Sequence, residues 1–242
     1  MLNHINLHRL LFIDIETVPL VATHDELSEE MKKLWDYRTY RFKPEEINFE
    51  DYFFEKAGVY AEFGKIVCIS LGFFAPHKIE NEYQFRVKSL YGDDEKTILR
   101  NFIDLLNGFF PKANTYLCGH NIVEFDVPFL CRRLIINDLN IPEMINISNK
   151  KPWEIPFIDT MRIWKFGDYR NQTSLHLLCT VLNIPTPKKN MEGSEVATVY
   201  WHDNNLERIK AYCQKDVVAT ARLILKFKHV PSLTDHEIVF SD

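Results

Sequence analysis

The stretch LLFIDIETVPL, residues 10–20, decides the fold, because it is apolar enough for a buried strand and yet carries Asp14 and Glu16. Side chains two positions apart on a strand point to the same face, so both acids share a face with Phe12. A buried carboxylate is costly unless something compensates its charge, and two adjacent carboxylates raise each other's pKa. Either the acids lie at an exposed strand end, where they meet solvent or cap a turn, or a cation that prefers oxygen ligands lies between them.

The overall composition is that of a folded globular protein. The chain has 242 residues, of which 46% are hydrophobic and 26% are charged, so it can bury a sizeable core. It carries 29 basic and 34 acidic side chains, for a net charge of -5. This balance argues against a protein that coats duplex nucleic acid by bulk attraction. It leaves room for a local basic groove and for an acidic pocket that binds metal.

The cysteines and the apolar runs bear on the compartment. The five cysteines form no CxxC pair, which argues against a zinc site or a redox motif. Their odd number, without framework spacing, predicts a reducing compartment, and we expect a cytoplasmic protein. The N-terminal apolar run is short and ends in acids, unlike a signal peptide. Since no run reaches about 18 apolar residues, we expect no membrane span and no membrane partner.

The order of the predicted elements points to an α/β fold. Strand-like segments cover residues 9–15, 65–75 and 81–91, and the last two alternate like a hairpin. Helix, strand, helix and strand patterns follow, and then helices. This order predicts a layered fold with a mixed sheet, first a meander and later parallel crossovers. Residues 21–62 are far longer than a hairpin requires and predict an aromatic, partly helical insertion. The insertion could cover the mouth of a site, or pack over one sheet face.

A second acid lies in GHNIVEFDVPFL, residues 119–130, which follows a predicted strand and opens a helix. Asp126 could be an ordinary acid of a helix N-terminus, where the helix dipole and unpaired backbone donors favour it. Asn121 could be an ordinary turn residue or a contact to a substrate. This segment alone does not distinguish a structural acid from a metal ligand.

The third segment is YCQKDVVAT, residues 212–220, within a long predicted helix. Asp216 interrupts the apolar stripe that faces the core, and an aspartate in that position requires a partner. Tyr212 lies one turn earlier on the same face, so that both side chains could point into one pocket. A hydrogen bond between the aspartate and a tyrosine or arginine at the helix edge is the structural alternative.

The three acidic segments together resemble a known enzyme superfamily. FIDIET, HNIVEFD and YCQKD are similar to the three motifs of the DEDD, or DnaQ-like, 3′–5′ exonucleases, in the same order. Position 211 is Ala and position 212 is Tyr, so the third motif resembles the tyrosine variant rather than the histidine variant. Between the motifs, the chain resembles bacterial predicted exonucleases related to the proofreading domain of family B DNA polymerases, over roughly residues 8–230.

This resemblance implies a fold and a metal site. The expected fold is RNase H-like, a five-stranded mixed sheet flanked by helices, with residues 1–242 forming a single exonuclease domain around the helical insertion. Two Mg²⁺ or Mn²⁺ ions are implied cofactors, as in two-metal hydrolysis of phosphodiesters. The resemblance implies that Asp14 bridges both ions. It implies that Glu16 and Asp216 hold the ion that activates water, and that Asp126 supports the other ion.

The resemblance also implies a function and further site residues. The expected activity is hydrolysis from the 3′ end of single-stranded DNA. An exoribonuclease is the alternative, because recognition of ribose rests on contacts to the 2′ position, and a catalytically silent polymerase-accessory module is a second alternative. A replication or repair polymerase is a candidate partner. Tyr212 would orient the attacking water, since a tyrosine with pKa near 10 is a poor base.

Other residues are candidate contacts to the nucleic acid. Thr17 could touch the terminal nucleotide, or be an ordinary turn residue. Phe125 could stack on a base, or pack in the core. Asn121 is a candidate substrate contact, and Lys188 and Lys189 in a Pro-rich loop could bind backbone phosphate or simply be solvated.

Overall fold

The computed structural model describes residues 2, 5–76, 83–109, 115–168, 170–185 and 191–241. Its strands are β1 (Leu10–Pro19), β2 (Gly64–Pro76), β3 (Tyr83–Tyr91), β4 (Tyr116–Gly119), β5 (Phe157–Asp159) and β6 (Ile238–Ser241). Its α-helices are α1 (Glu29–Thr39), α2 (Phe49–Lys56), α3 (Glu95–Phe109), α4 (Asp126–Ile136), α5 (Thr160–Lys165), α6 (Leu175–Val181), α7 (Val196–Trp201) and α8 (Leu206–Phe227). Lys188 and Lys189 lie outside the described residues.

The sheet has the mixed, RNase H-like topology that the sequence predicts. Its strand order is β5-β4-β1-β2-β3-β6. Strand β2 runs antiparallel to both β1 and β3, whereas the β1–β4, β4–β5 and β3–β6 pairs are parallel. The predicted number of five strands is wrong, because β6 pairs with the outer edge of β3. Pairing there satisfies backbone groups that an open edge would leave exposed.

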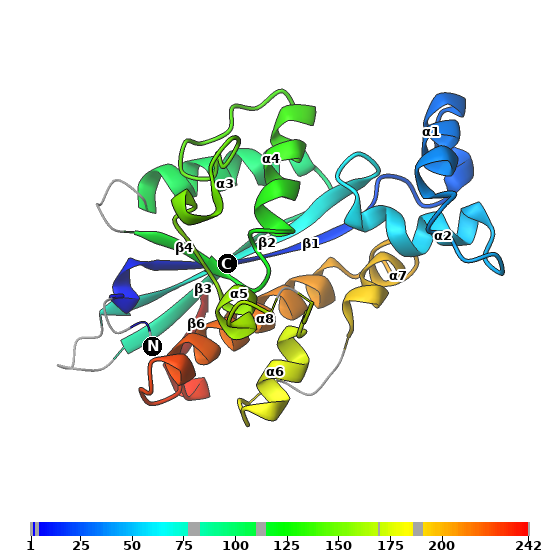
Figure 1. The fold of residues 1–242 in the computed structure, drawn as a ribbon. Coiled ribbons are helices and arrows are strands. Elements are labelled where there is room, and N and C mark those ends of the chain that lie inside the picture. The colour runs from blue at the N-terminus through cyan, green and yellow to red at the C-terminus, as the bar shows by residue number, and fades with distance from the viewer. Residues whose placement is uncertain are drawn as a thin grey trace.

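Helices cover both faces of the sheet (Figure 1). On one face α3 and α4 enclose a core that contains Leu11, Ile13 and Ile15 of β1. On the other face α8 and α6 enclose a core that contains Leu10 and Phe12. The alternation predicted for β1 is therefore confirmed, and its acids lie on the face that α8 covers. Among the described residues, none of the helices has the length and apolar character needed to cross a membrane.

Strand β1 is longer than the sequence indicates, since it continues to Pro19 rather than ending near Ile15. Its register with β2 shifts between Glu16 and Thr17. Such a bulge bends a strand and re-aims its side chains, and bulges are frequent beside active sites. Here it directly follows the second carboxylate.

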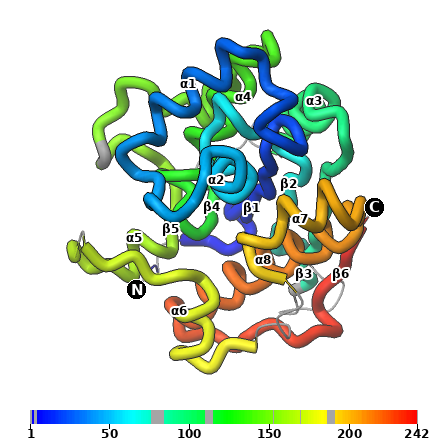
Figure 2. The backbone as a smooth tube through the Cα atoms, turned by 90° about the vertical axis from the view of Figure 1, so that its right-hand side faces the viewer, coloured from blue at the N-terminus to red at the C-terminus, as the bar shows by residue number. Residues whose placement is uncertain are grey.

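The insertion between β1 and β2 builds a small core of its own. Trp35 of α1 is fully buried, with the rings of Phe53 and Phe63 edge-on at 5.3 and 5.1 Å. Ser28 and Asn48 cap the N-termini of α1 and α2 by accepting backbone N–H groups. Much of its aromatic content therefore packs internally rather than over a sheet face. Figure 2 shows α1 and α2 in front of the end of β1.

Candidate active site

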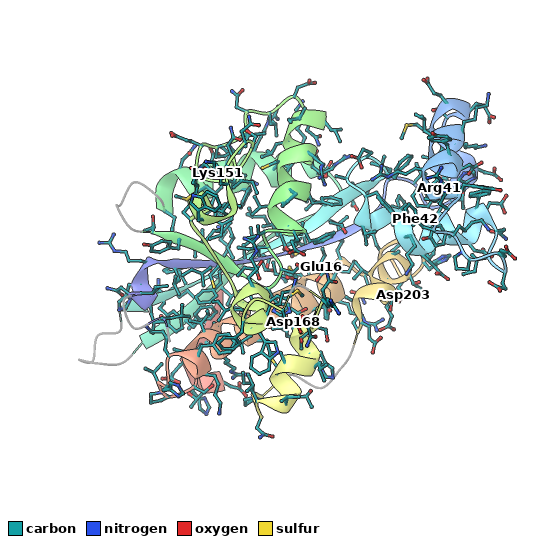
Figure 3. All side chains as sticks on the ribbon, viewed as in Figure 1. Glu16, Arg41, Phe42, Lys151, Asp168 and Asp203 are labelled. Atoms are coloured by element: carbon teal, nitrogen blue, oxygen red, sulfur yellow. The ribbon has the colours of Figure 1, made fainter. Side chains whose placement is uncertain are left out.

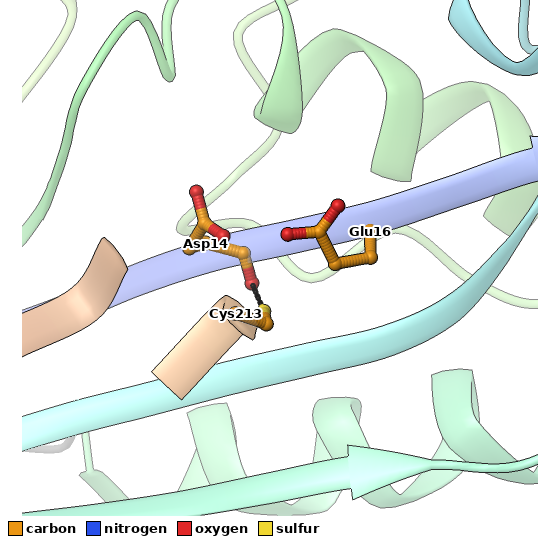
Figure 4. A group of neighbouring side chains, drawn as sticks. All are labelled: Asp14, Glu16 and Cys213. Carbon is orange, nitrogen blue, oxygen red and sulfur yellow. Dashed lines mark hydrogen bonds between the residues drawn. The ribbon is translucent and has the colours of Figure 1, made fainter. Parts of the chain in front are cut away.

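Asp14 and Glu16, the two acids of β1, lie against α8. Carboxylate oxygens of Asp14 and Glu16 and the Sγ of Cys213 all lie within 4.8 Å of one another (Figure 4). The Cys213 thiol donates a hydrogen bond of 3.4 Å to the backbone oxygen of Asp14, which fixes α8 against β1. Asp216 follows three residues later, within one turn of α8. Two segments some two hundred residues apart in sequence thus contribute to one acidic cluster.

Asp126, the first residue of α4, is the fourth acid of this cluster. The pKa of Asp14 is raised well above its usual range, first by burial and then by the negative charges of Asp216 and Asp126. Burial likewise raises the pKa of Glu16, and the charges of Asp14 and Asp216 add to the effect. Asp216 and Asp126 therefore lie near enough to Asp14 for their charges to act on it, in the neighbourhood that the sequence predicts for the four acids.

Asp126 and Asp216 hold protons at higher pH than ordinary aspartates. Burial raises the pKa of Asp126 to about 7, although a backbone hydrogen bond from Ile15 works in the opposite direction. Burial raises the pKa of Asp216 to about 6, although a hydrogen bond from Tyr212 and the charge of Lys215 lower it. Near neutral pH, each carboxylate therefore releases its proton more readily when a cation is close to it.

Tyr212 lies on α8 beside the acids, as the sequence predicts. Burial raises its pKa above the usual range, and the charges of Asp216, Glu16 and Asp14 raise it further. The phenol therefore stays protonated at neutral pH and can donate a hydrogen bond. This state suits a residue that orients a water molecule rather than one that removes its proton.

The donor set of the cluster fits hard divalent cations. Within the described residues, no lysine or arginine forms an ion pair with Asp14, Glu16 or Asp126. Burial raises the pKa of the Cys213 thiol well above its usual value, and a protonated thiol is a poor metal ligand. The carboxylates are thus the groups that could hold a metal ion, and oxygen ligands suit Mg²⁺ and Mn²⁺.

Glu95, another buried acid of the same protein, differs from the acidic cluster because hydrogen-bond donors surround it. Glu95 receives hydrogen bonds from the Arg133 guanidinium at both carboxylate oxygens, from the Ile66 backbone N–H at 2.8 Å and from Asn137 at 2.9 Å. The fold therefore neutralises a structural acid with its own donors. Among the described residues, it provides no such ion pair for Asp14, Glu16 or Asp126.

Sequence reasoning missed Asp159, which shapes the second motif. Its buried carboxylate accepts the backbone N–H groups of Asn121 and Val123 at 3.0 and 3.1 Å, and those of Met161 and Arg162 at the start of α5. It therefore fixes the loop that leads to α4. The signal in the sequence is an aspartate placed directly between a strand and a helix, which is the N-cap position.

A glycine allows this loop to approach β1. A Cβ on Gly119 would lie 1.9 Å from the Ile122 side chain and 2.9 Å from the backbone oxygen of Ile13. Only glycine fits such a close approach of two strands. The end of β4 can therefore lie beside the position of Asp14.

The three predicted substrate contacts have structural roles of their own. The Thr17 hydroxyl donates a 2.7 Å hydrogen bond to the backbone oxygen of Gly58, which ties the insertion to β1. Asn121 has a left-handed backbone with φ of 68°, as asparagine turn residues often do. Phe125 is partly buried, with its ring 5.6 Å from that of Phe129. The sequence pattern does not predict that Cys213 lies beside Asp14 and Glu16.

Comparisons with known proteins identify a family that the chain matches. The family described as "Predicted 3'-5' exonuclease related to the exonuclease domain of PolB" matches residues 59–239. No curated protein sequence matches the chain. Among solved structures, the RNase domain of the yeast Pop2 protein is 12% identical, with a TM-score of 0.43 over 94% of this chain and 80% of that chain. A chain in the structure of the yeast NOT1 MIF4G domain co-crystallised with CAF1 is 15% identical, with a TM-score of 0.40 over 84% and 80%.

Proposed function

Because the chain belongs to the family of predicted 3′–5′ exonucleases related to the exonuclease domain of PolB, we propose that it hydrolyses single-stranded DNA from the 3′ end with two divalent cations. The observation that carries this proposal is the convergence of four carboxylates, three of which, Asp14, Glu16 and Asp126, have no lysine or arginine ion-pair partner among the described residues. We also propose that residues 1–242 form one exonuclease domain, since strands from both ends of the chain share one sheet.

The geometry supports a distinct role for each carboxylate. The charges of Asp216 and Asp126 both raise the pKa of Asp14, and the charge of Asp14 raises that of Glu16, so Asp14 is the natural shared ligand. Glu16 and Asp216 would hold one cation with it, and Asp126 the other. Bound cations would lower the pKa of water and neutralise charge on the phosphate.

The remaining polar groups would position the reactants. Tyr212 keeps its proton at neutral pH, so its hydroxyl would donate to and orient the attacking water beside Asp216. The loop fixed by Asp159 would set the position of Asp126. Asn121 and Phe125 flank this loop and remain candidate contacts to the terminal nucleotide, with Thr17 contributing through its backbone.

A digestion assay tests this proposal. Single-stranded DNA and RNA labelled at the 5′ end are incubated with the protein and Mg²⁺ or Mn²⁺, with EDTA as the metal-free comparison. We expect a ladder that shortens from the 3′ end, abolished by a 3′ phosphorothioate block. Asp14→Asn should reduce the rate at least about 100-fold, because charge stabilisation by a bound cation is worth several kcal/mol.

The control variant is Asp104→Asn, which changes an exposed acid of α3 and should leave the rate unchanged. Absence of metal-dependent digestion of either polymer would refute the proposal, and binding without cleavage would indicate a silent binding module. Faster digestion of RNA than of DNA would favour an exoribonuclease.

A further inference from the structure

The outer surface of the insertion exposes large aromatic and apolar side chains among its charged ones. Trp35 of α1 is buried, but Leu34 and Tyr37 are 49% and 86% exposed. Tyr40 and Phe42, directly after the helix, are 76% and 71% exposed. Contiguous exposed apolar side chains of this size mark interaction surfaces.

These side chains line a groove of about 1300 Å³ between α1 and the end of α4. Ile136, the last residue of α4, and the buried Phe63 also line this groove. Arg38 and Arg41 line the same groove. Figure 3 shows Arg41 and Phe42 on the insertion, at the end of β1 beyond Glu16. We call this feature the α1 groove.

One segment of the α1 groove interleaves basic and aromatic side chains. Residues 37–43, YRTYRFK, carry three of each, and the acids Asp36 and Glu62 also line the groove. Of these acids, Asp36 lies 3.3 Å from the His24 ring. Arg41 is exposed and forms no ion pair within the described part of the chain. Basic side chains interleaved with exposed rings are the composition that binds single-stranded nucleic acid.

Helix α4 connects the α1 groove to the acidic cluster. Phe125, Pro128, Arg132 and Ile136 follow one another at steps of three and four residues, and thus form one stripe of the helix. Phe125 precedes Asp126 of the cluster, and Ile136 lines the groove. Arg132, between them, is exposed and has no ion-pair partner in the described ranges. At 1.5 Å per residue, the groove begins about 15 Å from Asp126.

We propose that the α1 groove binds the single-stranded nucleic acid upstream of its 3′ end, with bases stacked on Tyr37, Tyr40 and Phe42 and phosphates on Arg132 and Arg41. This inference rests on the proposed function, because it takes the strand whose 3′ end lies among the four carboxylates. At about 3.4 Å per stacked nucleotide, the 15 Å separation corresponds to about four nucleotides. The groove therefore engages substrates longer than that and ignores shorter ones.

A length series of oligonucleotides tests the inference. Affinity for oligothymidylates of about 2 to 16 nucleotides is measured in EDTA by fluorescence anisotropy. We expect the affinity of the unmodified protein to rise steeply beyond about four nucleotides. The double variant Tyr37→Ala, Tyr40→Ala should lose about tenfold or more for long oligonucleotides and nothing for the shortest. The ring-retaining pair Tyr37→Phe, Tyr40→Phe should keep the gain.

Two further variants separate stacking from charge and from surface effects in general. Arg132→Gln should lower the slope of log affinity against log salt by about 0.7, the value for one phosphate contact of a single strand. Phe240→Ala removes another exposed aromatic ring, on β6 at the edge of the sheet, and should change nothing. If the double tyrosine variant melts at a markedly lower temperature, Phe42→Ala replaces it as the test of stacking.

Hydrolysis of thymidine 5′-(p-nitrophenyl phosphate) with Mn²⁺ separates failure of the inference from failure of the proposed function. This ester is too small to reach the groove, so its kcat/KM should be equal in the tyrosine variants and the unmodified protein. Hydrolysis of the ester without any length-dependent affinity would overturn the groove inference alone, and leave the groove open to a protein partner. The opposite outcome is a protein that cleaves nothing but binds long oligonucleotides more tightly, with the tyrosine variants losing that gain. This outcome would support nucleic-acid binding by the α1 groove and refute the proposed nuclease activity.

Discussion

Removal of divalent cations should make the stability of this protein fall as pH rises from about 5 to 8. The reason is the pKa of Asp126, which burial raises from 3.8 to about 7. A carboxyl whose pKa is higher in the folded state favours folding fully below its unfolded pKa. That contribution is lost as pH rises through the folded pKa. The loss therefore spans about pH 4 to pH 7, and Asp216, raised to about 6, loses its contribution in the same direction.

The magnitude follows from the pKa of Asp126 alone. A displacement from 3.8 to about 7 corresponds to about 4 kcal/mol over the whole range. Between about pH 5 and pH 8 the loss is about 2–3 kcal/mol, because part of it has already occurred below pH 5. For a chain of this length, that lowers the melting temperature by about 5–10 °C. Bound Mg²⁺ or Mn²⁺ should reverse the trend, since a ligand of the folded state stabilises it.

The assay is thermal unfolding in EDTA and in excess Mg²⁺ or Mn²⁺, over a series of pH values. Asp126→Asn should flatten the pH dependence in EDTA and raise the melting temperature near pH 8, while it weakens stabilisation by the metal. Asp104→Asn, on the exposed side of α3, should follow the unmodified protein. A metal-free melting temperature that stays constant or rises between about pH 5 and 8 would refute the reasoning.

Three further predictions concern single side chains. Arg133→Ala should cost about 3–5 kcal/mol in urea unfolding, because it leaves Glu95 charged and buried, and Arg133→Met with Glu95→Leu should recover much of that loss. An equal loss in the double variant would contradict this account. Tyr212→Phe should lower kcat about 10- to 100-fold in steady-state digestion with little change in KM, since it removes only the orienting hydroxyl; a change confined to KM would indicate substrate binding instead. Asp159→Ala should cost at least about 1–3 kcal/mol in urea unfolding, because it leaves buried backbone donors unpaired, and undiminished stability would show that water replaces the carboxylate.

The sequence predicts those features that depend on local pattern. The alternation of β1 gives the face of Asp14 and Glu16, and the stripe of α8 gives that of Tyr212 and Asp216, because side-chain direction repeats regularly in both elements. The meander followed by parallel crossovers gives the arrangement of the central strands.

Features that depend on distant pairing escape a single sequence. The four residues of β6 become a strand only because the edge of β3 is open to them, and no local pattern shows that edge. The position of Cys213 beside Asp14 depends on how α8 crosses β1. The role of Asp159 depends on a loop that lies nearly forty residues earlier in the chain. In each case the deciding partner is far away along the chain.

The contrast between Glu95 and the acidic cluster explains why this site is chemically distinct. Both are buried carboxylates in one small protein, and both carry the cost of burying charge. For Glu95 the fold places Arg133 and Asn137 around the carboxylate, and the charge becomes part of the packing. For Asp14 and Glu16 the surrounding elements contribute further carboxylates, which raise the cost. A fold that neutralises one buried acid and concentrates others leaves a negative charge that the divalent cations and bound phosphate of the proposed exonuclease reaction would balance.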